Sequence, residues 1–163
     1  MMKNIAKISY CRNVALVTLR NVPHESGIIG EILTAISEQG INVDMISQTA
    51  PLGNAISIAF SISLEAMEQL MPIINGLKPK YPKLHMEMSP GMTKLNFYDP
   101  NMESTPGVAA QVFNMFARGN IRVIMITTSI MDISVLISEH DEDAALELCR
   151  KSYNLEPLEN ACT

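Results

Sequence analysis

Apolar positions in the first half of the chain switch repeatedly between a period of two and a period of 3.6. β-forming residues come first, then aliphatic side chains at i, i+3, i+4 spacing, then two alternating stretches on either side of a Pro51–Asn54 turn. Helical spacing resumes with Pro72 inside it, which predicts a kink, and a last short stretch supplies a closing strand. In chain order the six segments are residues 14–19, 27–38, 41–46, 56–62, 67–77 and 84–88.

The same order recurs about 80 residues later, which indicates an internal repeat. Gly27 matches Gly107, and the pair Met45-Ile46 matches Met125-Ile126. Each copy then passes through a short turn into an Ile-Ser strand, which we align as Ile56-Ser57 with Ile133-Ser134. The predicted segments of the second copy are residues 95–98, 106–118, 121–128, 133–137 and 141–152.

The second copy has no strong closing strand of its own. Leu155 to Thr163 contains Pro157 and few β-forming residues, whereas Ile5 to Tyr10 is a strand-like segment left over at the other end of the chain. We therefore expect a first repeat over residues 11–90 and a second over 91–163, with residues 3–10 completing its sheet. The predicted fold class is α+β: two ferredoxin-like βαββαβ repeats, each an antiparallel sheet with its helices on one face.

Composition narrows the possible partners and location. The net charge is −5 and the basic residues are scattered, so no nucleic-acid partner is expected. No segment approaches the roughly 20 apolar residues of a membrane span, and Met1 to Ser9 lacks a secretory apolar core, so we expect no membrane partner and a cytoplasmic location. The cysteines are odd in number and lack CxxC spacing, which favours reduced thiols over a zinc site or a disulfide framework: Cys11, Cys149 and Cys162.

Three strings in the two copies resemble the regulatory region of aspartate kinases, which is a tandem pair of ACT domains. Gly40 to Ile46 is similar to that family's first-repeat signature, and Met102 to Ala110 resembles its second-repeat loop and helix start. Thr128-Ser129 followed by Ile133 to Ile137 extends the likeness, which covers nearly the whole chain. The resemblance implies ACT repeats that bind a free amino acid, with lysine or threonine as the candidate effector and lysine biosynthesis as the setting.

The family also carries an N-terminal amino-acid-kinase domain, which this chain lacks. Its 163 residues contain no Gly-rich phosphate loop with a following lysine and no acid/base constellation. We therefore expect a non-catalytic chain without metal or cofactor, acting on a kinase domain or subunit. Departures from the family pattern are His24 and Ser26, which replace an Asp and a Pro, and Arg122 at the position matching Asn42. They leave open whether the second site is degenerate or altered in specificity.

An amino-acid effector is a zwitterion, so its site needs donors for a carboxylate and acceptors for an ammonium group. The loop before the first helix offers unpaired backbone N–H groups at the positive end of the helix dipole, and polar side chains of the next strand share one face. We expect the pocket to combine the loop of one repeat with the strand of a facing repeat. The predicted effector-binding residues are Ser26, Gly27, Ile28, Asn42, Asp44 and Gln48, and those of a possible second site are Thr105, Pro106, Gly107, Val108, Arg122 and Thr127.

Three of the predicted effector-binding residues also have a structural explanation. Ser26 is a good N-cap, Gly27 suits a tight turn, and Asp44 could pair with a donor or lie in a polar interface. Open sheet edges favour pairing with another copy, so a homodimer is expected. Three functions therefore stay open: an amino-acid sensor, a ligand-free structural dimerisation module, and the regulatory fragment of an aspartate kinase.

Overall fold

The computed structural model describes residues 5–161 and divides the chain into two compact units. One, here called the inserted unit, runs from Asn13 to Pro90; the other, the flanking unit, contains the described residues up to Arg12 and those from Gly91 onward. The chain passes between the units within two long strands, β1 (Lys7–Pro23) and β4 (His85–Tyr98). Each unit is described separately below.

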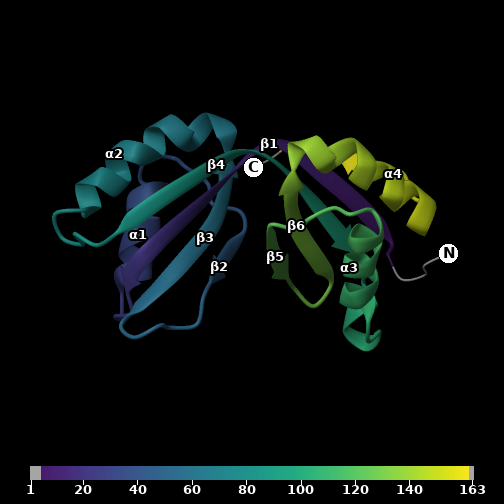
Figure 1. Cartoon of the computed structure of the whole chain (residues 1–163), viewed down its shortest axis with the longest axis horizontal. Coiled ribbons are helices and arrows are strands. Elements are labelled where there is room, and N and C mark those ends of the chain that lie inside the picture. Colours follow the sequence, from purple (N-terminus) through teal and green to yellow (C-terminus); the bar gives the residue numbers. More distant parts are fainter. Residues whose placement is uncertain (1–4, 162–163) are drawn as a thin grey trace. The chain divides into compact units, whose positions relative to one another are not determined.

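The inserted unit is a four-stranded sheet with two helices (Figure 1). After β1 come α1 (Ile28–Ser37), the hairpin of β2 (Ile46–Gln48) and β3 (Ala55–Ser63), and then α2 (Met67–Leu77). The strand order is β2-β3-β1-β4, and β3 is antiparallel to both β2 and β1. The predicted helix over residues 67–77 is confirmed at both ends, with Pro72 inside it.

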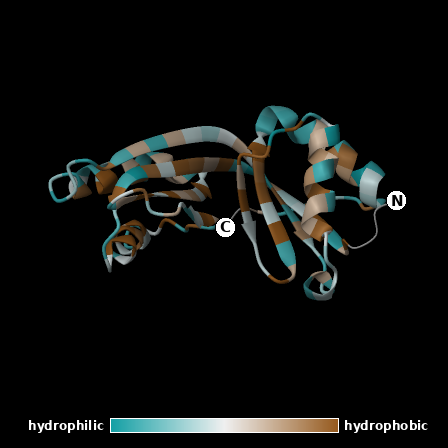
Figure 2. Cartoon of the chain, turned by 60° about the horizontal axis from the view of Figure 1, so that its bottom comes forward, coloured by the Kyte–Doolittle hydropathy of each residue, from teal (hydrophilic) through white to brown (hydrophobic). Residues whose placement is uncertain are grey.

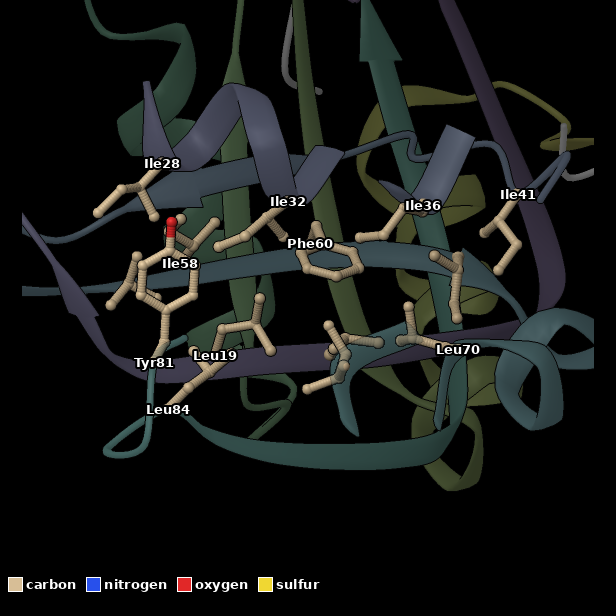
Figure 3. Packing of buried hydrophobic residues seen from close by; sticks show 14 of the residues in the cluster. Leu19, Ile28, Ile32, Ile36, Ile41, Ile58, Phe60, Leu70, Tyr81 and Leu84 are labelled. Carbon is tan, nitrogen blue, oxygen red and sulfur yellow. The ribbon is translucent and has the colours of Figure 1, made fainter. Parts of the chain in front are cut away.

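Both helices of the inserted unit pack on one hydrophobic cluster. The i, i+4 spacing of α1 turns Ile28, Ile32 and Ile36 toward the strands, as Figure 3 shows. Every second residue of the central strands faces the same cluster, so the pleat and the helix period agree on one core. Other buried members of the cluster are Leu19, Ile41, Ile58, Phe60, Leu70, Ile74, Tyr81 and Leu84.

The flanking unit repeats this architecture with its own elements. After β4 come α3 (Val108–Arg118), the hairpin of β5 (Met125–Thr128) and β6 (Asp132–Ser138), α4 (Glu142–Tyr153) and a two-residue strand β7 (Leu158–Glu159). Both β4 and β5 are antiparallel to β6. Bands of hydrophobic and more polar residues alternate along the strands in Figure 2, as expected for sheets with one face against a core.

The N-terminal part of β1 lies beside β4 in the flanking unit. The Ala6 N–H donates to the Tyr98 carbonyl oxygen at 2.8 Å, and β7 adds a short parallel pairing in which Ser9 is opposite Leu158. Residues 3 and 4 of the predicted N-terminal segment lie outside the described residues. Each unit thus combines a largely antiparallel set of strands with two helices, which confirms the predicted ferredoxin-like fold class.

Strands β2 and β5 begin later than the predicted starts at residues 41 and 121. In the first case the backbone still runs beside β3: the Asp44 N–H donates to the Ser61 carbonyl oxygen at 3.1 Å, and the Met45 N–H donates to Ser61 Oγ at 3.0 Å. The Ser61 hydroxyl oxygen is therefore the acceptor at a position where a regular strand pair would use a backbone carbonyl oxygen. The alternation of apolar and polar residues in the sequence cannot reveal this change of acceptor, because the burial pattern of residues 41–48 stays periodic.

The predicted alignment of the two Ile-Ser strands is also corrected by two residues. Ile46 pairs with Phe60 in the inserted unit, whereas the matching Ile126 pairs with Val135 in the flanking unit. The β2–β3 hairpin is therefore longer than the β5–β6 hairpin, and Ile58 rather than Ile56 is equivalent to Ile133. The shared dipeptide sits at different levels of the two sheets.

The prediction that all cysteines are reduced thiols is wrong for Cys11, which is disulfide-bonded. Cys149 is a free thiol in the core of the flanking unit, where burial raises its pKa to about 12. Cys162 lies outside the described residues. Over residues 5–161, no helix has the length and apolar character needed to cross a bilayer, and no group of three metal-ligating side chains converges.

Candidate effector site

The first helix of each unit starts in the same unusual way. Gly27 caps α1 with φ 91°, and Gly107 caps α3 with φ 93°, so both occupy the left-handed region that favours glycine. The first intrahelical bonds run from the Glu31 N–H to the Gly27 oxygen at 2.9 Å and from the Gln111 N–H to the Gly107 oxygen at 3.0 Å. Neither helix has a side-chain cap among the described residues. Ser26 is therefore not the N-cap, and that alternative is wrong.

These helix starts face open space. A methyl group built on Gly27 or Gly107 would meet no described atom within 4 Å. The N–H groups of the three residues after each glycine precede the first intrahelical bond, so the helix itself supplies them with no acceptor. Ile28 is only 5% exposed because its side chain packs in the core, so its backbone N–H is the part that a ligand could use. Each loop thus has the features of an anion-binding helix start.

The predicted polar residues of the first repeat do share one side of their strand. Asn42, Asp44 and Gln48 are all exposed, while Ile41 before them and Met45 between them are buried. The period of two therefore persists through the irregular segment before β2. Because β2 is the last strand of the sheet order, these side chains line a sheet edge.

The loop and the Asp44 end of the polar edge lie at opposite ends of the inserted unit's sheet. Pro23, just before the loop, pairs with Ala55, and the His24 N–H donates to the Asn54 oxygen at 2.9 Å. Asp44 bonds to Ser61, which is six residues and roughly 20 Å further along β3 at 3.3 Å per residue. A single inserted unit therefore does not bring Gly27 and Asp44 together.

The corresponding edge of the flanking unit has different chemistry. Arg122 and Ile124 are exposed where the first repeat has Asn42 and Asp44, so the carboxylate has no equivalent. Thr127 is half-buried and pairs with Ser134, on the other side of the strand from Arg122. The exposed hydroxyl that shares the Arg122 side is Thr128, which the sequence analysis did not select.

The predicted loop residues of this second set are near one another in the chain and remain so in space. Thr105 donates from Oγ1 to the Asn101 oxygen at 2.9 Å, which holds the loop before Gly107. Pro106 is exposed, and Val108 is buried at the first turn of α3, as Ile28 is in α1. The helix start of the second site thus matches that of the first, whereas the side chains on the neighbouring strand edge do not.

An ionic cluster around the buried carboxylate of Glu142 in the flanking unit was not predicted from the sequence. Glu142 accepts from Arg12 Nε and from Thr93 Oγ1, each at 2.7 Å, and Arg12 also bonds Glu159 at 3.1 Å. Burial alone would raise the pKa of Glu142, but the bonds from Arg12 and Thr93 outweigh it and the pKa is lowered. The sequence gives no sign of this cluster, because Arg12 and Glu142 are 130 residues apart.

Comparison with known proteins now adds an independent line of evidence. The ACT domain family matches residues 100–153. Aspartokinase from Helicobacter pylori (strain ATCC 700392 / 26695) is 31% identical over 93% of this chain, which covers 37% of that protein. The chain spans little more than a third of the length of the curated relatives it matches.

Two solved structures match over nearly their whole length. The ligand-free regulatory subunit of aspartate kinase from Thermus thermophilus is 26% identical, with a TM-score of 0.81 over 93% of this chain and 99% of that one. A chain from the crystal structure of aspartokinase alpha and beta subunits is 28% identical, with a TM-score of 0.83 and the same coverage. Residues 100–153 therefore match the ACT domain family, and nearly the whole chain is similar to the regulatory regions and regulatory subunits of aspartate kinases.

Proposed function

We propose that this chain is a non-catalytic sensor that binds lysine or threonine and regulates an aspartate kinase domain or subunit. The observation that carries the proposal is the pair of uncapped helix starts at Gly27 and Gly107, each opening onto free space. Backbone N–H groups at the positive end of a helix dipole suit the carboxylate common to all amino acids. The proposed function then depends on which residues hold the ammonium group of the amino acid.

The inserted unit supplies the better ammonium acceptors. Asp44 and Asn42 are exposed on the β2 edge, but they lie about 20 Å along the sheet from Gly27 at 3.3 Å per residue. We propose that a second copy of the chain closes this gap, so that the helix start of one copy meets the β2 edge of the other. The homodimer would then be the binding-competent form, and effector binding would stabilise it.

The regulated partner in this proposal is a kinase. The region matched in the curated aspartokinases is about a third of each protein, and one solved relative comes from a structure named for alpha and beta subunits. We propose that the kinase domain is either fused to this region or held as a separate subunit, in the cytoplasm and in lysine biosynthesis. The chain itself contributes binding and coupling rather than chemistry.

Titration calorimetry with lysine, threonine and the other common amino acids tests the proposal. We expect heat for one of them at millimolar concentration, loss of that heat in Asp44→Asn, and its retention in the matched β5-edge variant Ile124→Ala. Asp44→Asn keeps the shape and removes the charge, so it isolates the ammonium contact. Absence of heat and of a thermal shift with every amino acid would contradict the sensor.

A second candidate is a structural dimerisation module without a ligand. The observation that favours it is a run of exposed apolar side chains in the flanking unit, of which Ile124 is 42% and Ile126 44% exposed; the others are Ile130 and Met131. Sedimentation of the wild type and Ile126→Lys distinguishes the two functions. A dimer that dissociates in Ile126→Lys and responds to no amino acid would favour the structural module.

A further inference from the structure

The short strand β7 covers one edge of the flanking unit's sheet. Within this unit β5 forms one edge and the N-terminal part of β1, next to β4, forms the other. On the far side of β1 from β4, Ser9 pairs with Leu158 and Tyr10 with Glu159. The Asn160 N–H also donates to the Tyr10 carbonyl oxygen at 2.8 Å. β7 therefore occupies backbone groups that would otherwise form an open edge.

The β1 edge has little protection of its own. Residues 8–11 carry no charge and contain no proline, and they are flanked by the cations Lys7 and Arg12. Sheet edges that stay open to water usually carry charges, prolines or bulges that prevent pairing with another strand. Without β7, this edge would therefore be able to accept an extended segment as an added strand.

The side chains beside this edge bind a carboxylate on the paired strand. Glu159 accepts from Arg12 Nη1 at 3.1 Å and from the Tyr10 hydroxyl at 3.2 Å. Arg12 is itself held in place, because its Nε donates to Glu142 at 2.7 Å and its guanidinium carbon lies 5.3 Å from the centroid of the Tyr10 ring. The cation is therefore positioned by the rest of the unit, which favours recognition of a carboxylate.

β7 itself is held weakly. Leu158 is 51% exposed, and the Arg12–Glu159 ion pair is about half exposed on both sides. Exposed ion pairs contribute little to stability, and segments with few apolar contacts open most easily. The chain just before β7 is different, because Pro157 is buried and Leu155 packs against the hydrophobic cluster of the unit. Displacement would therefore affect only the residues from Leu158 onward.

We propose that this β1 edge is a binding site for an extended, acidic segment of a partner protein, and that β7 is a displaceable cover that occupies it. The partner segment pairs with Ser9 and Tyr10 in place of β7 and directs a carboxylate at Arg12. Backbone pairing supplies the attachment and the charged contact supplies the selectivity, as in other cases of strand addition. All the contacts lie within the flanking unit, so the proposal does not rest on amino-acid binding.

NMR titration of the full-length chain with a capped peptide of residues 157–161, Pro-Leu-Glu-Asn-Ala, tests the site. A dithiol reductant is present throughout, so that the disulfide at Cys11 plays no part. Glu159→Lys removes the carboxylate of the chain's own β7. We expect saturable shifts of the Ser9 and Tyr10 amides and a Kd about tenfold lower in Glu159→Lys than in the wild type, where the tethered strand competes. A peptide with Gln in place of its Glu should bind severalfold more weakly.

Glu147→Lys is the matched control, because it makes the same change at an exposed glutamate of α4 that pairs with Lys151. It should bind the peptide as the wild type does. Unchanged shifts of core residues establish folding, and a moved Asn160 amide signal shows that β7 is released in Glu159→Lys. If that variant does not fold, comparison of the two peptides on the wild type still tests the site.

Three results would overturn the proposal. They are an unmoved Asn160 signal in Glu159→Lys, equal binding of the Glu and Gln peptides, and no peptide binding to the released edge. Sedimentation of Glu159→Lys separates the remaining occupant. Self-association without peptide binding would assign the edge to a second copy of the chain and contradict the acidic partner.

Discussion

The two units share a backbone plan but differ at their sheet edges and in how their ends are secured. Both begin their first helix at a left-handed glycine with nearly equal φ. On the following edge the inserted unit exposes Asp44 where the flanking unit exposes Ile124. In the proposed function the shared helix starts hold the carboxylate, and the differing sheet edges decide what else is recognised. The two copies of the repeat thus share their helix starts and differ in the sheet edges beside them.

Substitutions in the two cores should have the largest effect and test whether the units unfold separately. Phe97 is fully buried and meets Phe116 edge-on, with ring centroids 5.8 Å apart. Phe97→Ala should destabilise the flanking unit by about 3–5 kcal/mol, and Phe60→Ala the inserted unit by a similar amount. Hydrogen exchange measured by residue should show each loss confined to its own unit. Equal loss of protection in both units for either variant would mean one cooperative structure.

The ionic cluster distinguishes the flanking unit and should give the next largest effect. Glu142→Gln should destabilise by about 1–2 kcal/mol, because a charge-assisted bond is lost but the half-exposed Arg12 is screened by solvent. The folded pKa of Glu142 is lowered, so its stabilisation is complete above the ordinary value of 4.5 and is lost as pH falls through the folded pKa. Denaturant unfolding at neutral and acidic pH should therefore show the gap between wild type and variant closing in acid.

The inserted unit offers a control for this prediction. Glu31 accepts from Lys80 Nζ at 2.7 Å and from Tyr81 at 2.6 Å, and the Lys80 and Tyr81 bonds lower its pKa. Its carboxylate is far more exposed than that of Glu142, so Glu31→Gln should destabilise less. A larger effect at Glu31 would show that burial of the Glu142 carboxylate does not strengthen the ionic cluster of the flanking unit.

Sequence reasoning succeeded where one local pattern determines one element. The aliphatic spacing of residues 67–77 is enough to define α2, because each apolar side chain has a place on one core-facing stripe. It failed where residues far apart in the sequence determine the local structure. Ser61 Oγ accepts a hydrogen bond from the Met45 N–H, and Arg12 binds Glu142, which is 130 residues away. For the site, the pattern identified the loops and the exposed face of the edge, but the separation of Gly27 from Asp44 follows only from strand register.

Alanine at the two helix-starting glycines should have equal effects on stability and unequal effects on binding. Both positions have φ near 90° and open space for a methyl group, so Gly27→Ala and Gly107→Ala should each destabilise by about 1–2 kcal/mol through backbone strain alone. Thermal unfolding measures that cost. If the inserted unit is the effector site, calorimetry should show lost affinity only in Gly27→Ala, and equal losses would assign binding to both units.

Exchange of the edge residues gives the sharpest test of specialisation. Ile124 is exposed, so Ile124→Asp should change the free energy of unfolding by less than about 0.5 kcal/mol. Asp44→Ile should abolish the heat of amino-acid binding, because the ammonium group loses its carboxylate. Ile124→Asp should weaken self-association if the apolar β5 edge is an interface, since a carboxylate would then be buried without a partner. It should leave the heat of binding intact if the binding-competent dimer forms through the β2 edge alone. Sedimentation and calorimetry on the two variants separate these roles, and a loss of both properties in either variant would mean that one edge serves both purposes.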